Sequence, residues 1–133
     1  MKARDIGAVV LGALFIFAGS MHFIRTEFYL RMMPPYIPAH LLLVQISGVC
    51  EMLGGIGLIV PATRRIAAIG LIALLIAVFP ANIQMALHPD LYRDIGPPAA
   101  FYIRLPLQLV AIWLVWWAGA IGAMMRPRIL RGS

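Results

Sequence analysis

The sequence predicts an all-α integral membrane protein that folds as a four-helix bundle, and its composition and its pattern of apolar runs both indicate this. Of its 133 residues, 62% are hydrophobic and 12% are charged, whereas a typical soluble domain is nearly half apolar and about a quarter charged. The apolar residues form four runs, each close to the roughly 20 residues that a helix needs to cross the hydrocarbon core. One transmembrane domain, residues 1–133, is expected at this length.

The four expected spans follow one another with short connections. They cover residues 6–23, 41–60, 66–86 and 105–125. Helices are expected because an open sheet would leave backbone groups unpaired in lipid. The first run begins like a secretory signal with a weak small-residue cleavage site, but it continues into His22 and Phe23 without a polar region. We therefore expect a retained helix.

The basic residues near the span ends predict the orientation of the bundle. Seven fall on one side: Lys2, Arg4, Arg64, Arg65, Arg126, Arg128 and Arg131. Four fall on the other: Arg25, Arg31, Arg93 and Arg104. The short turn at 61–65 is the most informative connection, since it holds two arginines. Both termini are therefore expected to face the cytoplasm.

Two longer segments are expected on the outer side. Residues 26–40 contain Pro34, Pro35 and Pro38, so we expect them to lie along the membrane interface without forming a helix. Residues 87–103 also carry prolines and aromatics. They are expected to cap the outer mouth of the bundle or to anchor it in the interface.

Small residues recur in the second and fourth spans. They are Gly48, Gly54, Gly55, Gly57, Gly119, Ala120, Gly122 and Ala123. Small side chains allow helices to approach closely. Packing within one bundle is the favoured interpretation, and a homo-oligomer interface is the alternative.

Glu51 is the acidic residue that requires an explanation. It alone of the five acidic residues lies within a span, about 15 Å below the outer end of its helix. An unpaired carboxylate at that depth costs several kcal/mol, so Glu51 must be protonated or paired. A functional role is the favoured interpretation, and a structural pair with Arg104 or His22 is the alternative.

Polar residues in the outer half of the bundle are the candidate partners of Glu51. They are His22, Ser47, Asn82, Gln84, Arg104 and Gln108. Pro80 deprives the carbonyl of Ile76 of its helical donor and predicts a kink beside Asn82. Together they predict an outer-half pocket for a ligand with a polar head group.

Each polar residue also has a simpler interpretation. His22 and Arg104 are equally explained as interfacial side chains, and the amides as hydrogen bonds between helices. Straight helices would place His22 and Glu51 roughly 13 Å apart along the membrane normal. A direct contact between them therefore requires tilt, a shifted span boundary or a bridging water.

Several other functions are not predicted. The net charge of +6 does not indicate nucleic-acid binding, because the basic residues lie between apolar runs and do not form a patch. The single cysteine, Cys50, excludes an internal disulfide. His22, His40 and His88 lack metal-ligand spacing, so no metal site is expected. A haem held by His22 is a minor alternative.

Six short strings in this order resemble the DoxX family of small bacterial membrane proteins. They are Gly19-Ser20-Met21-His22-Phe23, Pro38-Ala39-His40, Ser47-Gly48-Val49-Cys50-Glu51, Arg64-Arg65, Phe79-Pro80-Ala81-Asn82-Ile83 and Arg104-Leu105-Pro106-Leu107-Gln108. The resemblance implies a multi-pass protein of the bacterial inner (cytoplasmic) membrane that is associated with oxidoreductases such as thiosulfate:quinone oxidoreductase. It also implies that five of the polar residues occupy the family's motif positions, namely His22, Glu51, Asn82, Arg104 and Gln108. The Cys-x-x-Cys pair of a thiol oxidoreductase is missing from the sequence.

Three functions remain open from the sequence. The first is a subunit that binds a quinone or isoprenoid for a membrane redox partner, in which Glu51 bonds the head group while Arg104 and Gln108 orient it. The second is an enzyme in which Glu51 and His22 act as acid and base on a hydrophobic substrate such as an epoxide, alkene or quinol. The third is a scaffold that packs against other membrane subunits.

Overall fold

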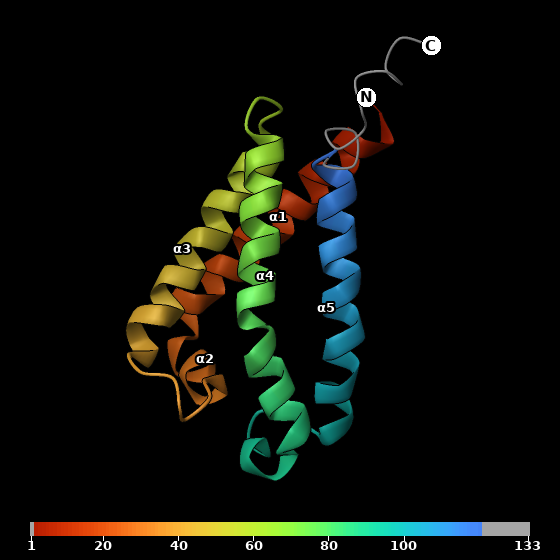
Figure 1. The fold of residues 1–133 in the computed structure, drawn as a ribbon. Helices are drawn as coiled ribbons and strands as arrows, with labels where there is room; N and C mark the ends of the chain where they lie inside the picture. Colours follow the sequence, from red (N-terminus) through yellow and green to blue (C-terminus); the bar gives the residue numbers. More distant parts are fainter. Residues whose placement is uncertain (1, 121–133) are drawn as a thin grey trace.

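A computed structural model describes residues 2–120, and these residues form helices joined by short connections (Figure 1). The elements are α1 (Ala3–Ile24), α2 (Thr26–Met32), α3 (His40–Ile59), α4 (Arg64–Leu87), the 3₁₀ helix η1 (Pro89–Tyr92) and α5 (Pro98–Ala118). Four of them, α1, α3, α4 and α5, are long and apolar enough to cross a membrane. The prediction of an all-helical chain with four span-length helices is confirmed for these residues.

The four long helices pack in the order α1, α3, α4 and α5, and α5 also contacts α1. The start of α1, the turn between α3 and α4, and the last residues of α5 lie at one end of the bundle, which we name the turn end (Figure 1). The opposite end carries α2 and η1, and we name it the α2 end. It corresponds to the predicted outer side. α1 runs obliquely, so it lies beside α5 at the turn end and beside α2 and α3 at the other.

Paired glycines bring the backbones of α1 and α3 together. A Cβ atom built on Gly12 would lie 2.5 Å from the carbonyl oxygen of Gly55, and one on Gly19 would lie 2.6 Å from that of Gly48. Both pairs belong to one antiparallel register. The small residues of the second span therefore serve packing within the bundle, as the favoured interpretation expected.

Two buried clusters fill the interior. Leu58, Ala68, Leu71 and Val115 join α3, α4 and α5 near the turn end. Met85, Ala86, Tyr92 and Phe101 join α4, η1 and α5 at the α2 end. Large apolar side chains on the outer surfaces of the four helices stay exposed. Lipid is the solvent that such a surface requires.

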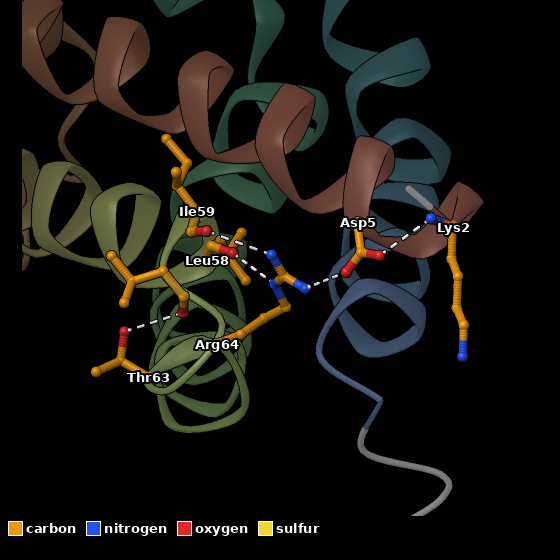
Figure 2. A network of polar contacts seen from close by, with 7 residues as sticks. Lys2, Asp5, Leu58, Ile59, Thr63 and Arg64 are labelled. Atoms are coloured by element: carbon orange, nitrogen blue, oxygen red, sulfur yellow. Dashed lines mark hydrogen bonds and ion pairs between the residues drawn. The ribbon is translucent and has the colours of Figure 1, made fainter.

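An arginine network closes the turn end (Figure 2). Arg64 Nε donates to the carbonyl of Leu58 over 2.7 Å, and Arg64 Nη2 donates to that of Ile59 over 3.3 Å. Its Nη1 atom lies 2.8 Å from Oδ1 of Asp5 on α1. One guanidinium thus satisfies carbonyls at the C-terminus of α3 and ties them to α1.

The segment that follows α1 contains a helix, contrary to the sequence prediction. α2 covers Thr26–Met32, before the first of the three prolines. The residue preceding a proline is biased toward extended backbone, and Met33 before Pro34 has φ −70° and ψ 133°. The prolines therefore end α2, but they do not prevent it. Arg31 on α2 lies 2.7 Å from Asp94 in the loop between η1 and α5.

The fourth long helix begins at Pro98, whereas the predicted span begins at residue 105. Pro98 occupies the first helical position, where its missing N–H costs nothing and its fixed φ favours the helix. The helix also continues through Pro106. Residues 121–125 of the predicted span, together with Gly122 and Ala123, lie outside the described residues, as do Arg126, Arg128 and Arg131.

Candidate functional site

A cavity of about 380 Å³ lies toward the α2 end, among all four long helices and α2. Its volume is within the range of pockets that bind small molecules. Apolar side chains form most of its wall, and these include Val44, Leu74, Leu75, Val78 and Leu107. The polar lining residues are His22, Tyr29, Ser47, Glu51, Asn82, Arg104 and Gln108. The structure thus brings six of the seven predicted site residues to one cavity.

Gln84 is the predicted site residue that does not line this cavity. Its side chain lies by the hydroxyl of Tyr92, in the contact between α4 and η1. There it belongs to the packing of the α2 end.

His22 and Glu51 are in direct contact in the cavity wall. Nε2 of His22 lies 3.2 Å from Oε2 of Glu51, and the side chains are 12% and 16% exposed. The predicted separation of roughly 13 Å along the normal does not keep them apart. When α1 and α3 are aligned by the Gly12–Gly55 and Gly19–Gly48 pairs, Glu51 lies only about 9 Å from His22 along the helix axes, toward the turn end. Side chains lean toward the N-terminus of their own helix, so in antiparallel helices these two lean toward each other.

The hydrogen-bond partners of His22 define where its protons lie. Nδ1 is 2.9 Å from the carbonyl oxygen of Ala18, which can only accept, so Nδ1 carries a proton. One further proton between Nε2 and Glu51 satisfies both groups, either as a carboxylic acid donating to imidazole or as imidazolium donating to carboxylate. Both arrangements have no net charge, which is the state that low-dielectric surroundings favour. The pair is a proton-carrying contact in the cavity wall.

Tyr29 on α2 is a site residue that the sequence analysis missed. Its ring stacks on that of His22 with centroids 4.0 Å apart and planes 18° apart. Burial raises the pKa of Tyr29, and the Glu51 carboxylate raises it further, while the Arg104 guanidinium lowers it. The phenol therefore lies near ionisable side chains on α3 and on α5.

Asn82 and Gln108 form a bridge between α4 and α5. The amide of Asn82 donates to Oε1 of Gln108, and the Gln108 amide donates to the carbonyl of Leu75. The acceptor, the carbonyl of Leu75, is next to that of Ile76 in α4. The Ile76 carbonyl lacks its helical donor because Pro80 has no N–H. Gln108 is buried, and its hydrogen bonds make that burial tolerable.

Arg104 contributes the positive charge of the cavity. It lies one helical turn from Gln108 on the same face of α5, and both line the cavity. Ser47 likewise lies one turn from Glu51 on α3 and lines the cavity beside it.

The histidines outside the cavity do not assemble a ligand set. His40 Nε2 lies 3.1 Å from the carbonyl of Pro34 and fastens the loop before α3. Within residues 2–120, no three His, Cys, Asp or Glu side chains are grouped as metal ligands. Both ring nitrogens of His22 already have partners, so binding a haem iron through Nε2 would break the contact with Glu51.

Comparisons with known proteins identify a family but no activity. Neither the curated proteins nor the solved structures contain a match to the chain. The resemblance to the DoxX family therefore remains a prediction. The model of a family described as a domain of unknown function, DUF8561, matches residues 11–121. Since this match covers most of the sequence, the chain belongs to the DUF8561 family.

Proposed function

We propose that the protein binds a lipid-soluble molecule with a polar head group in the cavity toward the α2 end. The contact between His22 and Glu51 in the wall of a mostly apolar cavity is the observation that carries this proposal. Packing between helices alone requires satisfied polar groups, but it does not require a cavity beside them. An apolar wall with a few convergent polar groups is typical of small-molecule sites.

A quinone is the ligand class that the DoxX resemblance implies, and the cavity residues fit one. Its carbonyl oxygens need donors, which Arg104 and the second N–H of the Gln108 amide provide, and the proton shared by Glu51 and His22 can be donated to the quinone only if it leaves the bond between them. Its ring and tail need apolar surface, which the leucines and valines of α3, α4 and α5 provide. The role would be that of a subunit accessory to a membrane redox partner, which would supply the electron-transfer chemistry.

The binding test compares two Glu→Gln variants. Purified wild-type protein, Glu51→Gln and Glu27→Gln are titrated in nanodiscs with a short-tailed ubiquinone, and tryptophan fluorescence is measured. Glu27 is exposed on α2 and serves as the matched control. We expect Glu51→Gln to weaken binding roughly tenfold, because the variant loses the proton that Glu51 shares with His22, and about 1.4 kcal/mol is the size of one hydrogen bond.

Mass spectrometry of small molecules that co-purify in mild detergent extends the test to ligands that are not quinones. A molecule that is present with wild type and Glu27→Gln but absent with Glu51→Gln would identify the class. If no small molecule accompanies the wild type and the quinone affinity is equal in all three proteins, the protein is a scaffold and the proposal is wrong.

An enzyme that uses His22 and Glu51 as base and acid is the second candidate function, and their 3.2 Å separation favours it. Proton transfer to a hydrophobic substrate needs such a pair beside an apolar cavity. His22→Gln and Glu51→Gln should then abolish conversion of the co-purifying molecule while Tyr29→Phe retains it. Conversion that survives both substitutions would exclude acid–base catalysis by this pair.

We further propose that the turn end faces the cytoplasm of a bacterial inner membrane. The basic turn between α3 and α4 and the basic start of α1 share this end, in keeping with the positive-inside rule. In a Cys50→Ser background, Ala62→Cys should resist a membrane-impermeant maleimide in intact cells while Asp90→Cys reacts. The reverse pattern would contradict the orientation.

A further inference from the structure

Arg104 faces the interior of the bundle and not the lipid. It lies between Phe101 and Gln108 on α5, which are 1% and 7% exposed, and the three residues follow the i, i+3, i+7 spacing of one helix face. It is also about 9 Å from the start of α5 at Pro98. An arginine that reached only for lipid head groups would lie on the outer face of the helix.

No carboxylate of the described chain neutralises Arg104. Four of the five acidic side chains have a basic or histidine partner within ion-pair distance. The pairs are Asp5 with Arg64, Glu51 with His22, Asp90 with Arg93, and Asp94 with Arg31. The fifth acid, Glu27, is exposed on α2 and forms no ion pair within residues 2–120.

The cavity therefore has an excess of one positive charge. The His22–Glu51 pair shares one proton and adds no net charge, and Asn82, Gln108, Ser47 and Tyr29 are neutral. A partly buried guanidinium inside a helix bundle is costly without a counter-charge. A neutral head group would accept a hydrogen bond from Arg104 but would leave that charge in place.

We propose that the cavity selects amphiphiles with an oxyanion head, a carboxylate or a phosphate monoester, and that Arg104 binds that head. This inference rests on the proposed function and narrows its polar head group to a charged one, so that a quinone should bind more weakly than an amphiphile with an oxyanion head. The planar guanidinium matches two oxygens of such a head with parallel hydrogen bonds. The alkyl or isoprenoid body would lie against Leu74, Val78 and Leu107.

The experiment uses two probes with the same chain, one with a carboxylate head and one in which a methyl ester removes the charge. Parinaric acid and its methyl ester are titrated into the purified full chain in neutral detergent, and probe fluorescence is recorded. Wild type should bind the acid roughly tenfold more tightly than the ester. Arg104→Gln should lose this preference, and Arg104→Lys should retain part of it because the charge remains but the planar fork is lost. Arg93→Gln removes an exposed arginine and should leave the preference unchanged.

A competition experiment distinguishes an oxyanion that is the head of an amphiphile from a free inorganic anion. Dodecyl phosphate should displace bound parinaric acid, while inorganic phosphate at the same concentration should not. Displacement by both alike would show a site for a free anion and would overturn the requirement for an amphiphile.

Failure of the inference and failure of the proposed function give different results. Equal binding of acid and ester by wild type and by Arg104→Gln, with both weakened by Glu51→Gln, would overturn the oxyanion inference and leave the proposed function standing. If neither probe nor the ubiquinone binds, the proposed function itself fails. If Arg104→Gln does not fold, wild type alone decides the inference, since equal affinity for the acid and the ester would contradict it.

Discussion

Gly48 on α3 lies directly against His22 on α1, and this contact positions His22 for its partner Glu51. A Cβ atom on Gly48 would lie 2.8 Å from Cβ of His22 and 2.9 Å from the carbonyl oxygen of Gly19. Neither neighbour is the flexible end of a side chain. Any larger residue at this position must therefore move α1 away from α3.

Gly48→Ala should consequently destabilise the bundle by about 1–3 kcal/mol, the usual cost of overpacking. Thermal unfolding in detergent measures this, and ligand binding should weaken along with it. Gly70→Ala is the matched control, because nothing lies within 4 Å of the added Cβ. It should be neutral or stabilise the helix by up to about 1 kcal/mol. Equal unfolding temperatures for Gly48→Ala and Gly70→Ala would contradict the close approach of α1 and α3 at Gly48.

Gln108→Leu should destabilise the protein by about 1–3 kcal/mol, because it removes the acceptor of the Asn82 amide and a donor to the Leu75 carbonyl. The double variant Asn82→Leu/Gln108→Leu should cost less than the sum of the single variants, since the residues form one network. Gln45→Leu, on the exposed face of α3, is the control and should change little. Strict additivity in the double-mutant cycle would exclude the bridge between α4 and α5.

Arg64→Gln should destabilise the turn end by about 2 kcal/mol, since the variant loses charge-assisted hydrogen bonds to the carbonyls of Leu58 and Ile59. The neighbouring Arg65→Gln should have little effect, because Arg65 is exposed. Asp5→Asn should cost less than Arg64→Gln, since both carbonyl contacts survive it. Chemical unfolding in mixed micelles measures the stability of the three variants. A larger loss of stability in Arg65→Gln than in Arg64→Gln would contradict the role given to Arg64.

The stability of the protein should fall as the pH rises through about 10. Burial raises the pKa of Tyr29 and of Tyr92 above the 10.0 of a free phenol. Below that pH both folded and unfolded states keep the proton, whereas above it the unfolded state ionises first and is favoured. Unfolding temperatures measured between about pH 8 and about pH 11 should show a smaller decline for Tyr29→Phe. Tyr102 is exposed on α5, so the unfolding temperature of Tyr102→Phe should decline with pH as that of wild type does.

The helices themselves were largely predictable, because the length of an apolar run is sufficient to indicate a span-length helix. The start of α5 was not. Pro97 and Pro98 indicate a loop when they are counted as helix breakers, but Pro98 occupies the one position where a helix favours proline. In the same way, the prolines after Met33 concealed the short helix that precedes them.

The residues that line the cavity were largely predictable, but the geometry of their contacts was not. Glu51 and His22 stand out as polar residues within apolar runs, and that signal is local. Their separation depends on the register between α1 and α3, which Gly19 and Gly48 define through contacts between distant parts of the chain. Tyr29 escaped notice because the helix breaks at Arg25 between it and His22, so no periodic pattern joins them.

The backbone contact between α1 and α3 has a mechanical consequence. Helices separated by side chains can slide by changing rotamers, but sliding α1 along α3 would drive a Cα of one into a carbonyl of the other at Gly12–Gly55 and Gly19–Gly48. These two helices therefore move as one rigid wall. A bound molecule can therefore widen the cavity only by displacing α2, or the face formed by α4 and α5.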